Sequence, residues 1–371
     1  MNYSFNINIC GFGFVGGSMG YLCERNNINY NVYDINKKEG NFNYFDNVSE
    51  LVKSNESNQS NVNYYFICVP TPSDSEGNCN TSIVESVVRD LSNTITKKSI
   101  ILVKSTVKPG TTRNLSNKYQ TENVRIVFCP EFLRELTCKD DVYNTNFTLF
   151  GCGLPRPHDG GDVGIEGNNV GIEGNNVGIE GNNVGIEGNN DGIEGNNDGI
   201  EGNNVGIEGN NIERGNVGVE GSNVEGDNDG IEGSNEELQN DLKDLFVNHL
   251  YKHKELGVFQ CIFKGFEECE LFKYTLNTFF GVKILFFNEI YELCESFKVD
   301  YQELKSLFPL DSRIGSYGIS VPGYDGKKGY GLSCLPKEIR GLKKLRESLG
   351  LPYEMYEYID KRNKEIRGED I

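Results

Sequence analysis

The chain has 371 residues, of which 37% are hydrophobic and 25% charged, so it can form two domains with buried cores. The net charge is −19, but residues 156–234 account for −15 of it and the rest of the chain for only −4. No basic stripe of the kind that binds nucleic acid is present. We therefore expect no nucleic-acid partner.

The 11 cysteines are scattered and form no Cys-x-x-Cys pair, which predicts neither a metal site nor a disulfide framework. Free thiols are typical of the reducing cytosol. The N-terminus lacks the basic and apolar pattern of a signal peptide, and the most apolar run, Phe279–Phe287, is short and contains Lys283. We expect a soluble, cytoplasmic protein with no membrane partner.

A Gly-x-Gly-x-x-Gly motif at residues 11–16 directly follows a predicted strand, Phe5–Cys10, and opens a helical pattern that ends at Arg25. A second predicted strand, Tyr30–Tyr33, ends at Asp34. In a dinucleotide-binding motif the glycines admit a pyrophosphate to the helix N-terminus and the acid binds a ribose hydroxyl, which favours NAD over NADP. The alternative is a structural turn with a surface Asp. The candidate cofactor contacts are Gly11, Gly13, Phe14, Val15, Gly16, Asp34 and Lys38.

Further apolar strands alternate with helical patterns, and each strand ends in a polar loop marked by Pro or Gly. The predicted strands are Tyr64–Val69, Ser99–Lys104, Arg125–Phe128 and Phe147–Phe150, the last strand of the domain, with a helix at Ile83–Leu91. This alternation predicts an α/β fold with a doubly wound parallel sheet, in which ligands bind at the carboxyl ends of the strands. The loops beginning near Pro70, Ser105 and Glu131 should therefore meet at one edge.

From Gly164 a seven-residue unit, Gly-Ile-Glu-Gly-Asn-Asn plus Val or Asp, repeats seven times, with Ile212 ending the seventh unit, and degenerates by about Ser234. Its Gly and Asn content opposes helix, and its few aliphatic residues cannot offset the entropy cost of ordering. We predict a disordered acidic insert at 156–234, with a small β-solenoid as the alternative.

After the insert the pattern is helical, at Asn235–Phe246 and Phe266–Phe297, and later at Glu338–Leu349 and Tyr353–Arg367. The long helix carries Lys273 and Asn277 on one face, where they can stabilise an oxyanion or lie solvated on the surface. Cys334 follows a glycine turn and precedes Lys337. A thiolate beside a cation is a nucleophile, although a cysteine after a turn can also be buried and structural.

These motifs together resemble the UDP-glucose/GDP-mannose dehydrogenase family, in order along the chain. They are the glycine motif, Pro70-Thr71-Pro72, Lys104-Ser105-Thr106, Pro130–Glu135, the helix with Lys273 and Asn277, Arg313-Ile314-Gly315 and Gly329–Lys337. The resemblance implies a Rossmann-like NAD-binding domain at 1–155 and a mainly α-helical central, dimerisation domain at 235–371. The sequence ends where the family's C-terminal UDP-binding domain would begin.

The resemblance also implies the chemistry: a nucleotide-sugar alcohol becomes an aldehyde, a thioester and then an acid, with two NAD reduced. Cys334 would be the nucleophile, Lys273 and Asn277 would stabilise the oxyanion, and Thr106 and Glu131 would position water, with Glu131 as the base. Further implied cofactor contacts are Pro70, Thr71, Thr106 and Glu135. Implied substrate contacts are Phe132, Leu133, Arg134, Glu135, Lys273, Asn277, Arg313 and Gly331, with Arg313 reaching into a partner subunit of a homodimer or larger homo-oligomer.

Two residues in or directly after the last of these motifs depart from the family pattern. Glu338, a further catalytic candidate, stands where the family usually has Asp, and Leu332 stands where it usually has Gly. UDP-glucose is the substrate that the resemblance favours, with UDP-glucuronate as product. GDP-mannose, an N-acetylated UDP-sugar and a non-catalytic NAD-binding scaffold remain alternatives. A β-hydroxyacid dehydrogenase would share the glycine motif but would not need Cys334.

Overall fold

The structure is a computed structural model that describes residues 5–56, 60–74, 77–153, 228–255, 257–332 and 334–369. The predicted insert and its β-solenoid alternative lie outside the described residues as far as residue 227. Helix α8 (Asn228–Lys243) begins seven residues before the helix start that the sequence predicts.

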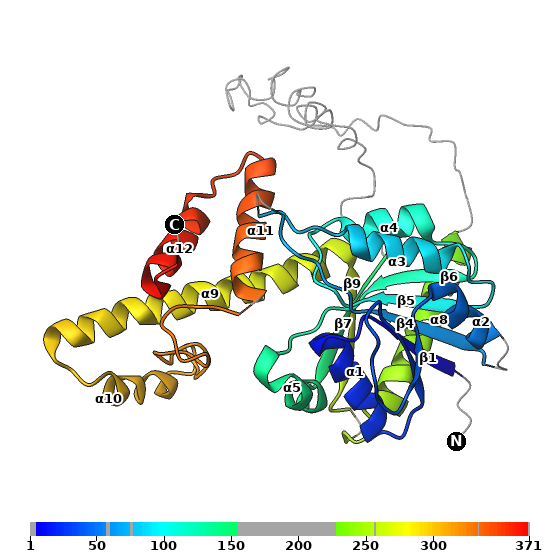
Figure 1. Cartoon of the computed structure of the whole chain (residues 1–371), viewed down its shortest axis with the longest axis horizontal. Coiled ribbons are helices and arrows are strands. Elements are labelled where there is room, and N and C mark those ends of the chain that lie inside the picture. Colours follow the sequence, from blue (N-terminus) through cyan, green and yellow to red (C-terminus); the bar gives the residue numbers. More distant parts are fainter. Residues whose placement is uncertain are drawn as a thin grey trace, which may run out of the picture. The chain divides into compact units, whose positions relative to one another are not determined.

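Eight strands form one sheet in the described part of the chain, in the order β3-β2-β1-β4-β5-β6-β7-β9 (Figure 1). They are β1 (Phe5–Cys10), β2 (Tyr30–Tyr33), β3 (Asn43–Phe45), β4 (Val62–Ile67), β5 (Ser99–Val103), β6 (Val124–Phe128), β7 (Phe147–Cys152) and β9 (Gln260–Gly265). All neighbours pair in parallel except β6 and β7. The predicted doubly wound fold is confirmed, and its strand order reverses between β1 and β4, where such sheets bind ligands.

Helices cover both faces of this sheet, so its central strands are buried throughout. Every residue of β4 and β5 is buried, which is why these strands read as continuous apolar runs in the sequence. One face carries α1 (Phe14–Arg25), α5 (Cys138–Asn144), the part of α8 from Leu238 onward and the π-helical segment η4 (Asp244–Leu250). The other carries α2 (Val48–Glu56), α3 (Ser82–Ser92) and α4 (Thr111–Tyr119).

The prediction that Phe147–Phe150 is the last strand is wrong. Strand β9 pairs in parallel with β7 over six residues, from Phe147 with Gln260 to Cys152 with Gly265. The segment was missed because it is only partly buried along most of its length, and because its partner strand lies far away in sequence. The chain therefore returns to the sheet after α8, and the long helix starts directly from the last strand.

Helix α9 (Phe266–Phe297) has the predicted bounds and joins the sheet to the remaining helices (Figure 1). These are α10 (Tyr301–Lys305), α11 (Cys334–Ser348) and α12 (Glu354–Arg367), with 3-10 turns η1 (Glu135–Thr137) and η5 (Phe308–Leu310). Phe266 belongs to the core under the sheet. Gly281 lets α11 pack closely, because a Cβ there would lie 2.4 Å from Ile339 Cδ1. No helix of the described residues is long and apolar enough to span a bilayer.

Candidate active site

The glycine motif forms a tight turn between β1 and α1. Gly11 has φ +93°, and a Cβ there would lie 2.7 Å from the Cys68 carbonyl oxygen, while a Cβ on Gly16 would lie 2.0 Å from the Gly11 oxygen. Gly13 borders open space and is the N-cap of α1 without a side-chain cap. The first-turn amides, at Phe14 and Val15, therefore lie where the phosphates of a dinucleotide would bind.

Asp34 lies at the end of β2, next to this turn. Its Oδ2 accepts a hydrogen bond from the Phe12 amide (2.7 Å), and its Oδ1 accepts one from the Asn36 amide (2.9 Å). Lys38 Nζ lies 3.7 Å from Asp34 Oδ2. The carboxylate is thus fixed beside the glycine turn, as binding of a ribose hydroxyl requires, and the residues present fit a dinucleotide.

Replacing Asp34 by Ala should weaken NAD binding about 10- to 100-fold, because a charged hydrogen-bond acceptor for the ribose is lost. NADP binding should weaken less, since the 2′-phosphate no longer meets a negative charge. Calorimetric titration of both nucleotides measures this, with Asp46→Ala, an exposed acid just after β3, as control. An unchanged preference for NAD over NADP would contradict the assigned role.

The loops after β4 and β5 meet at the same edge of the sheet. The buried Thr71 hydroxyl donates to the Thr106 carbonyl oxygen (2.9 Å), whereas Pro70 is exposed. Lys337 Nζ, from the first turn of α11, donates to Thr71 Oγ1 (3.0 Å). The sequence singled out Lys337 only as a neighbour of Cys334; this contact joins the cysteine helix to the cofactor edge.

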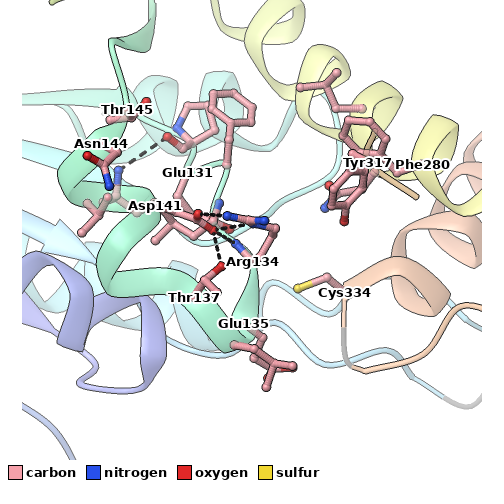
Figure 2. Close-up of a pocket in the computed structure, with 18 of the residues that line it drawn as sticks. Glu131, Arg134, Glu135, Thr137, Asp141, Asn144, Thr145, Phe280, Tyr317 and Cys334 are labelled. Atoms are coloured by element: carbon pink, nitrogen blue, oxygen red, sulfur yellow. Dashed lines mark hydrogen bonds and ion pairs between the residues drawn. The ribbon is translucent and has the colours of Figure 1, made fainter. Parts of the chain in front are cut away.

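A cavity of about 510 Å³ lies between the loop after β6, α9 and the start of α11. Figure 2 shows the Cys334 thiol pointing into it, across from Glu131 and Arg134, with Phe280 and Tyr317 on one wall. Of the predicted site residues it brings together Glu131, Phe132, Leu133, Arg134, Glu135, Asn277, Gly331 and Cys334.

Lys273, which does not line the cavity, forms a buried ion pair with Glu131, which does; the two side chains are only 3% and 6% exposed. Lys273 Nζ donates to Glu131 Oε1 (3.0 Å) and to the Glu131 carbonyl oxygen (2.7 Å). Burial opposes the charged ammonium, but the carboxylates of Glu131 and Glu338 outweigh it and raise the pKa of Lys273. Lys273 is therefore a fixed positive charge, as an oxyanion partner must be.

Glu338 lies one turn after Cys334 on α11 and is fully buried. Its Oε2 accepts a hydrogen bond from Asn277 Nδ2 (3.1 Å), while its Oε1 has no partner among the described residues. Burial raises the pKa of Glu338, although Lys273 lowers it in part. The carboxyl group thus keeps one acceptor position for a water or a ligand.

Arg134, a predicted substrate residue, is ion-paired to Asp141 of α5, which also accepts from the Thr137 hydroxyl (3.0 Å) (Figure 2). Despite the cost of burial, this pairing lowers the pKa of Asp141. The sequence missed Asp141, and likewise the cavity residues Tyr317 and Tyr324, because no local motif marks them and the fold brings them in from separate segments.

Two further predicted substrate residues differ in position: Gly331 lines the cavity, whereas Arg313 does not. The Arg313 side chain is 88% exposed, pairs with Asp311, and does not line the cavity. Gly331 packs against Arg367, whose Nη2 would lie 2.6 Å from a Cβ there. The next residue, Leu332, has φ +64°, a conformation that favours glycine, which is the residue that the resemblance leads us to expect at this position.

No group of three or more His, Cys, Asp or Glu side chains in the described part of the chain has the arrangement of a metal site.

Two models of one protein family match this chain. Residues 45–157 match the NAD-binding domain of the UDP-glucose/GDP-mannose dehydrogenase family, and residues 267–365 match its central domain. Together they cover more than half of the sequence, on either side of the insert. The chain belongs to this family. Its cofactor is NAD.

Individual relatives in the family match over shorter spans. YtcA of Bacillus subtilis (strain 168) is 24% identical over 283 residues, which are 75% of this chain and 45% of that protein. The UDP-glucose 6-dehydrogenase of Pseudomonas aeruginosa is 33% identical over 122 residues, 33% of this chain and 25% of that one. The chain thus spans less than half the length of these relatives.

Solved structures in the family share the fold. A UDP-glucose dehydrogenase of the archaeon Pyrobaculum islandicum superposes with a TM-score of 0.62 at 19% identity, over 98% of this chain and 68% of that one. A UDP-D-ManNAc dehydrogenase of Pyrococcus horikoshii superposes with 0.56 at 16% identity, over 97% and 68%. They differ in the sugar they are named for, so they do not assign a substrate here.

Proposed function

We propose that this protein is an NAD-dependent nucleotide-sugar dehydrogenase that oxidises UDP-glucose to UDP-glucuronate in two steps. The observation that carries the proposal is the position of the Cys334 thiol, in a cavity that Glu131 and Asn277 also line and that adjoins the cofactor edge. A dehydrogenase that performs a single oxidation of an alcohol needs no such thiol. The names of the relatives favour UDP-glucose.

In the proposed reaction the sugar C6 alcohol is first oxidised to an aldehyde, and the Cys334 thiolate adds to it to form a thiohemiacetal. NAD, when bound, accepts a hydride in each of the two oxidations. Lys273 and Asn277 stabilise the oxyanion. Oxidation of the thiohemiacetal leaves a thioester, which water hydrolyses with Glu131 as base and Thr106 helping to place the water.

The test is the number of NADH formed per sugar consumed, followed at 340 nm with UDP-glucose, GDP-mannose and an N-acetylated UDP-sugar. Two NADH per UDP-glucose, with little turnover of the others, is the expected result. If one of the other two sugars gave two NADH per molecule and UDP-glucose gave little, that sugar would be the substrate in place of UDP-glucose. Binding of NAD without NADH from any of the three would refute the dehydrogenase and favour the NAD-binding scaffold.

We infer that the protein forms a homodimer through α9. Four apolar side chains recur at seven-residue intervals on this helix and are between 41% and 57% exposed: Phe272, Phe279, Phe286 and Leu293. Residues seven apart lie on one face, and an apolar stripe of this length is typical of a helix that packs on a partner. In such a dimer the exposed Arg313 is free to enter the site of the second subunit. We also infer a cytoplasmic location, which the free cysteines of the protein support, since free thiols are typical of the reducing cytosol.

Phe286→Glu should convert the dimer to a monomer, because a charge in the centre of an apolar interface is buried without a partner. Sedimentation velocity over a range of protein concentrations measures the oligomeric state. Leu349→Glu, at an apolar side chain that is 62% exposed away from the stripe, is the control and should leave the dimer intact. A dimer that survives Phe286→Glu would place the interface elsewhere.

A further inference from the structure

We propose that Glu270 is a positioning residue: it fixes α9 along its axis against the nucleotide-binding sheet and so places Lys273 and Asn277 for the reaction. This inference rests on the proposed function, in which these two side chains stabilise the oxyanion. Glu270 lies in the second turn of α9, is fully buried, and does not line the cavity.

The carboxylate of Glu270 caps a helix of the other domain. Its Oε2 accepts from the Gly110 amide (2.7 Å), and its Oε1 accepts from the Thr112 amide (2.9 Å) and the Thr112 hydroxyl (2.8 Å). Gly110 is the N-cap of α4, has φ +92°, and supplies no side chain of its own. Glu270 therefore satisfies amides that the first turn of α4 would otherwise leave without acceptors. The capped loop follows β5 and carries Thr106.

Glu270 is one of three anchors on the same side of α9. One turn later Lys273 bonds to Glu131 in the loop after β6, and another turn later Asn277 bonds to Glu338 on α11. Of these three anchors, Glu270 is the one that bonds to the loop after β5, at Gly110. Without Glu270, α9 keeps its contact with Glu131 and the partly exposed pair of Glu267 with Arg113 on α4, but it loses the buried bonds to the loop that carries Thr106.

The charge of this anchor depends on pH near neutrality. Burial raises the pKa of Glu270 to about 7, against the effect of its three hydrogen bonds. The titratable groups around it are Glu267, Cys269 and Tyr274 on α9, and Arg113 on α4, which pairs with Glu267 (2.6 Å). The contribution of Glu270 to stability is thus largest below pH 4.5 and declines as pH rises to about 7, while its charged bonds to α4 strengthen.

The experiment compares Glu270→Gln with Glu267→Gln, which removes a neighbouring charge of the same interface but no cap. In Glu270→Gln the amides of Gly110 and Thr112 should lose protection from hydrogen exchange. We expect kcat to fall about 10- to 100-fold with KM values unchanged within about twofold, because orientation and not binding is lost. In the wild type kcat should rise with pH near 7, as Glu270 ionises and its bonds to α4 strengthen. This rise should be absent in Glu270→Gln. Glu267→Gln should retain all three properties.

Thr112→Val, which removes only the hydroxyl donor, should shift exchange and kcat in the same direction by a smaller factor, and it tests the cap even if Glu270→Gln does not fold. Unchanged exchange at Gly110 and Thr112 in both variants would overturn the proposal, as would full kcat with lost protection. Exchange needs no substrate. A wild-type protein that makes no NADH, with exchange altered in the variants, would therefore refute the proposed reaction and not the cap.

Discussion

Cys334→Ser should abolish steady-state NADH formation from UDP-glucose, with turnover reduced at least about 10⁴-fold. A serine hydroxyl is a far weaker nucleophile than a thiolate, and no second cysteine of the described residues lines the cavity. The first oxidation does not use the thiol. A single-turnover experiment should therefore still give up to one NADH per site, and the second NADH should be missing.

The matched control for this variant is Cys261→Ser, at a partly buried cysteine of β9 that does not line the cavity. Its turnover should equal that of the wild type. If Cys334→Ser still produced two NADH per sugar, the thioester route would be wrong, and a hydrated aldehyde would be the remaining substrate for the second oxidation.

Lys273→Met should have the second largest effect, on both activity and stability. Loss of an oxyanion partner should reduce kcat about 10²- to 10³-fold. Because Glu131 would be left as a buried carboxylate without its cation, the free energy of unfolding should fall by about 3–5 kcal/mol. Both effects follow from one side chain that is almost wholly buried.

Guanidinium denaturation and initial rates at saturating substrate measure the two effects separately. The control is Lys118→Met, which breaks a Lys–Glu pair with the same 3.0 Å separation but with side chains 60% and 38% exposed. Its stability should change far less, because solvent screens the pair and replaces its hydrogen bonds. Equal losses in the two variants would show that Lys273 is not the desolvated charge that the proposed reaction requires.

The arrangement of the first strands could be predicted from sequence, because a strand that is buried on both faces of the sheet consists largely of consecutive apolar residues. β1 and β2 have the predicted bounds, and β4 is displaced by two residues. The carboxyl ends of parallel strands lie at the same edge of a sheet, so the contact between Thr71 and Thr106, in the loops after β4 and β5, could be predicted from the order of the strands. β9 could not be predicted in the same way, since its pairing with β7 is non-local.

The cavity was predictable only in part. Glu131 and Cys334 carry local motifs, and the fold brings them to one cavity. Asp141, Tyr317 and Tyr324 have ordinary sequence surroundings, and only packing brings them to the same place. The full burial of Glu338 could not be predicted either, because glutamate side chains are almost never fully buried unless they are paired.

The late position of β9 has a consequence for synthesis of the chain. Phe147 of β7 pairs with Gln260, 113 residues further along the chain, while β7 pairs with β6 only at Phe128 and Gly151. At about 5–20 residues per second a ribosome needs roughly 5–20 s to add that many residues. During this interval the nascent sheet ends in an apolar strand with open backbone groups, the kind of edge at which chains aggregate. Emergence of β9 from the ribosome ends that exposure and at the same time delivers the first turn of α9.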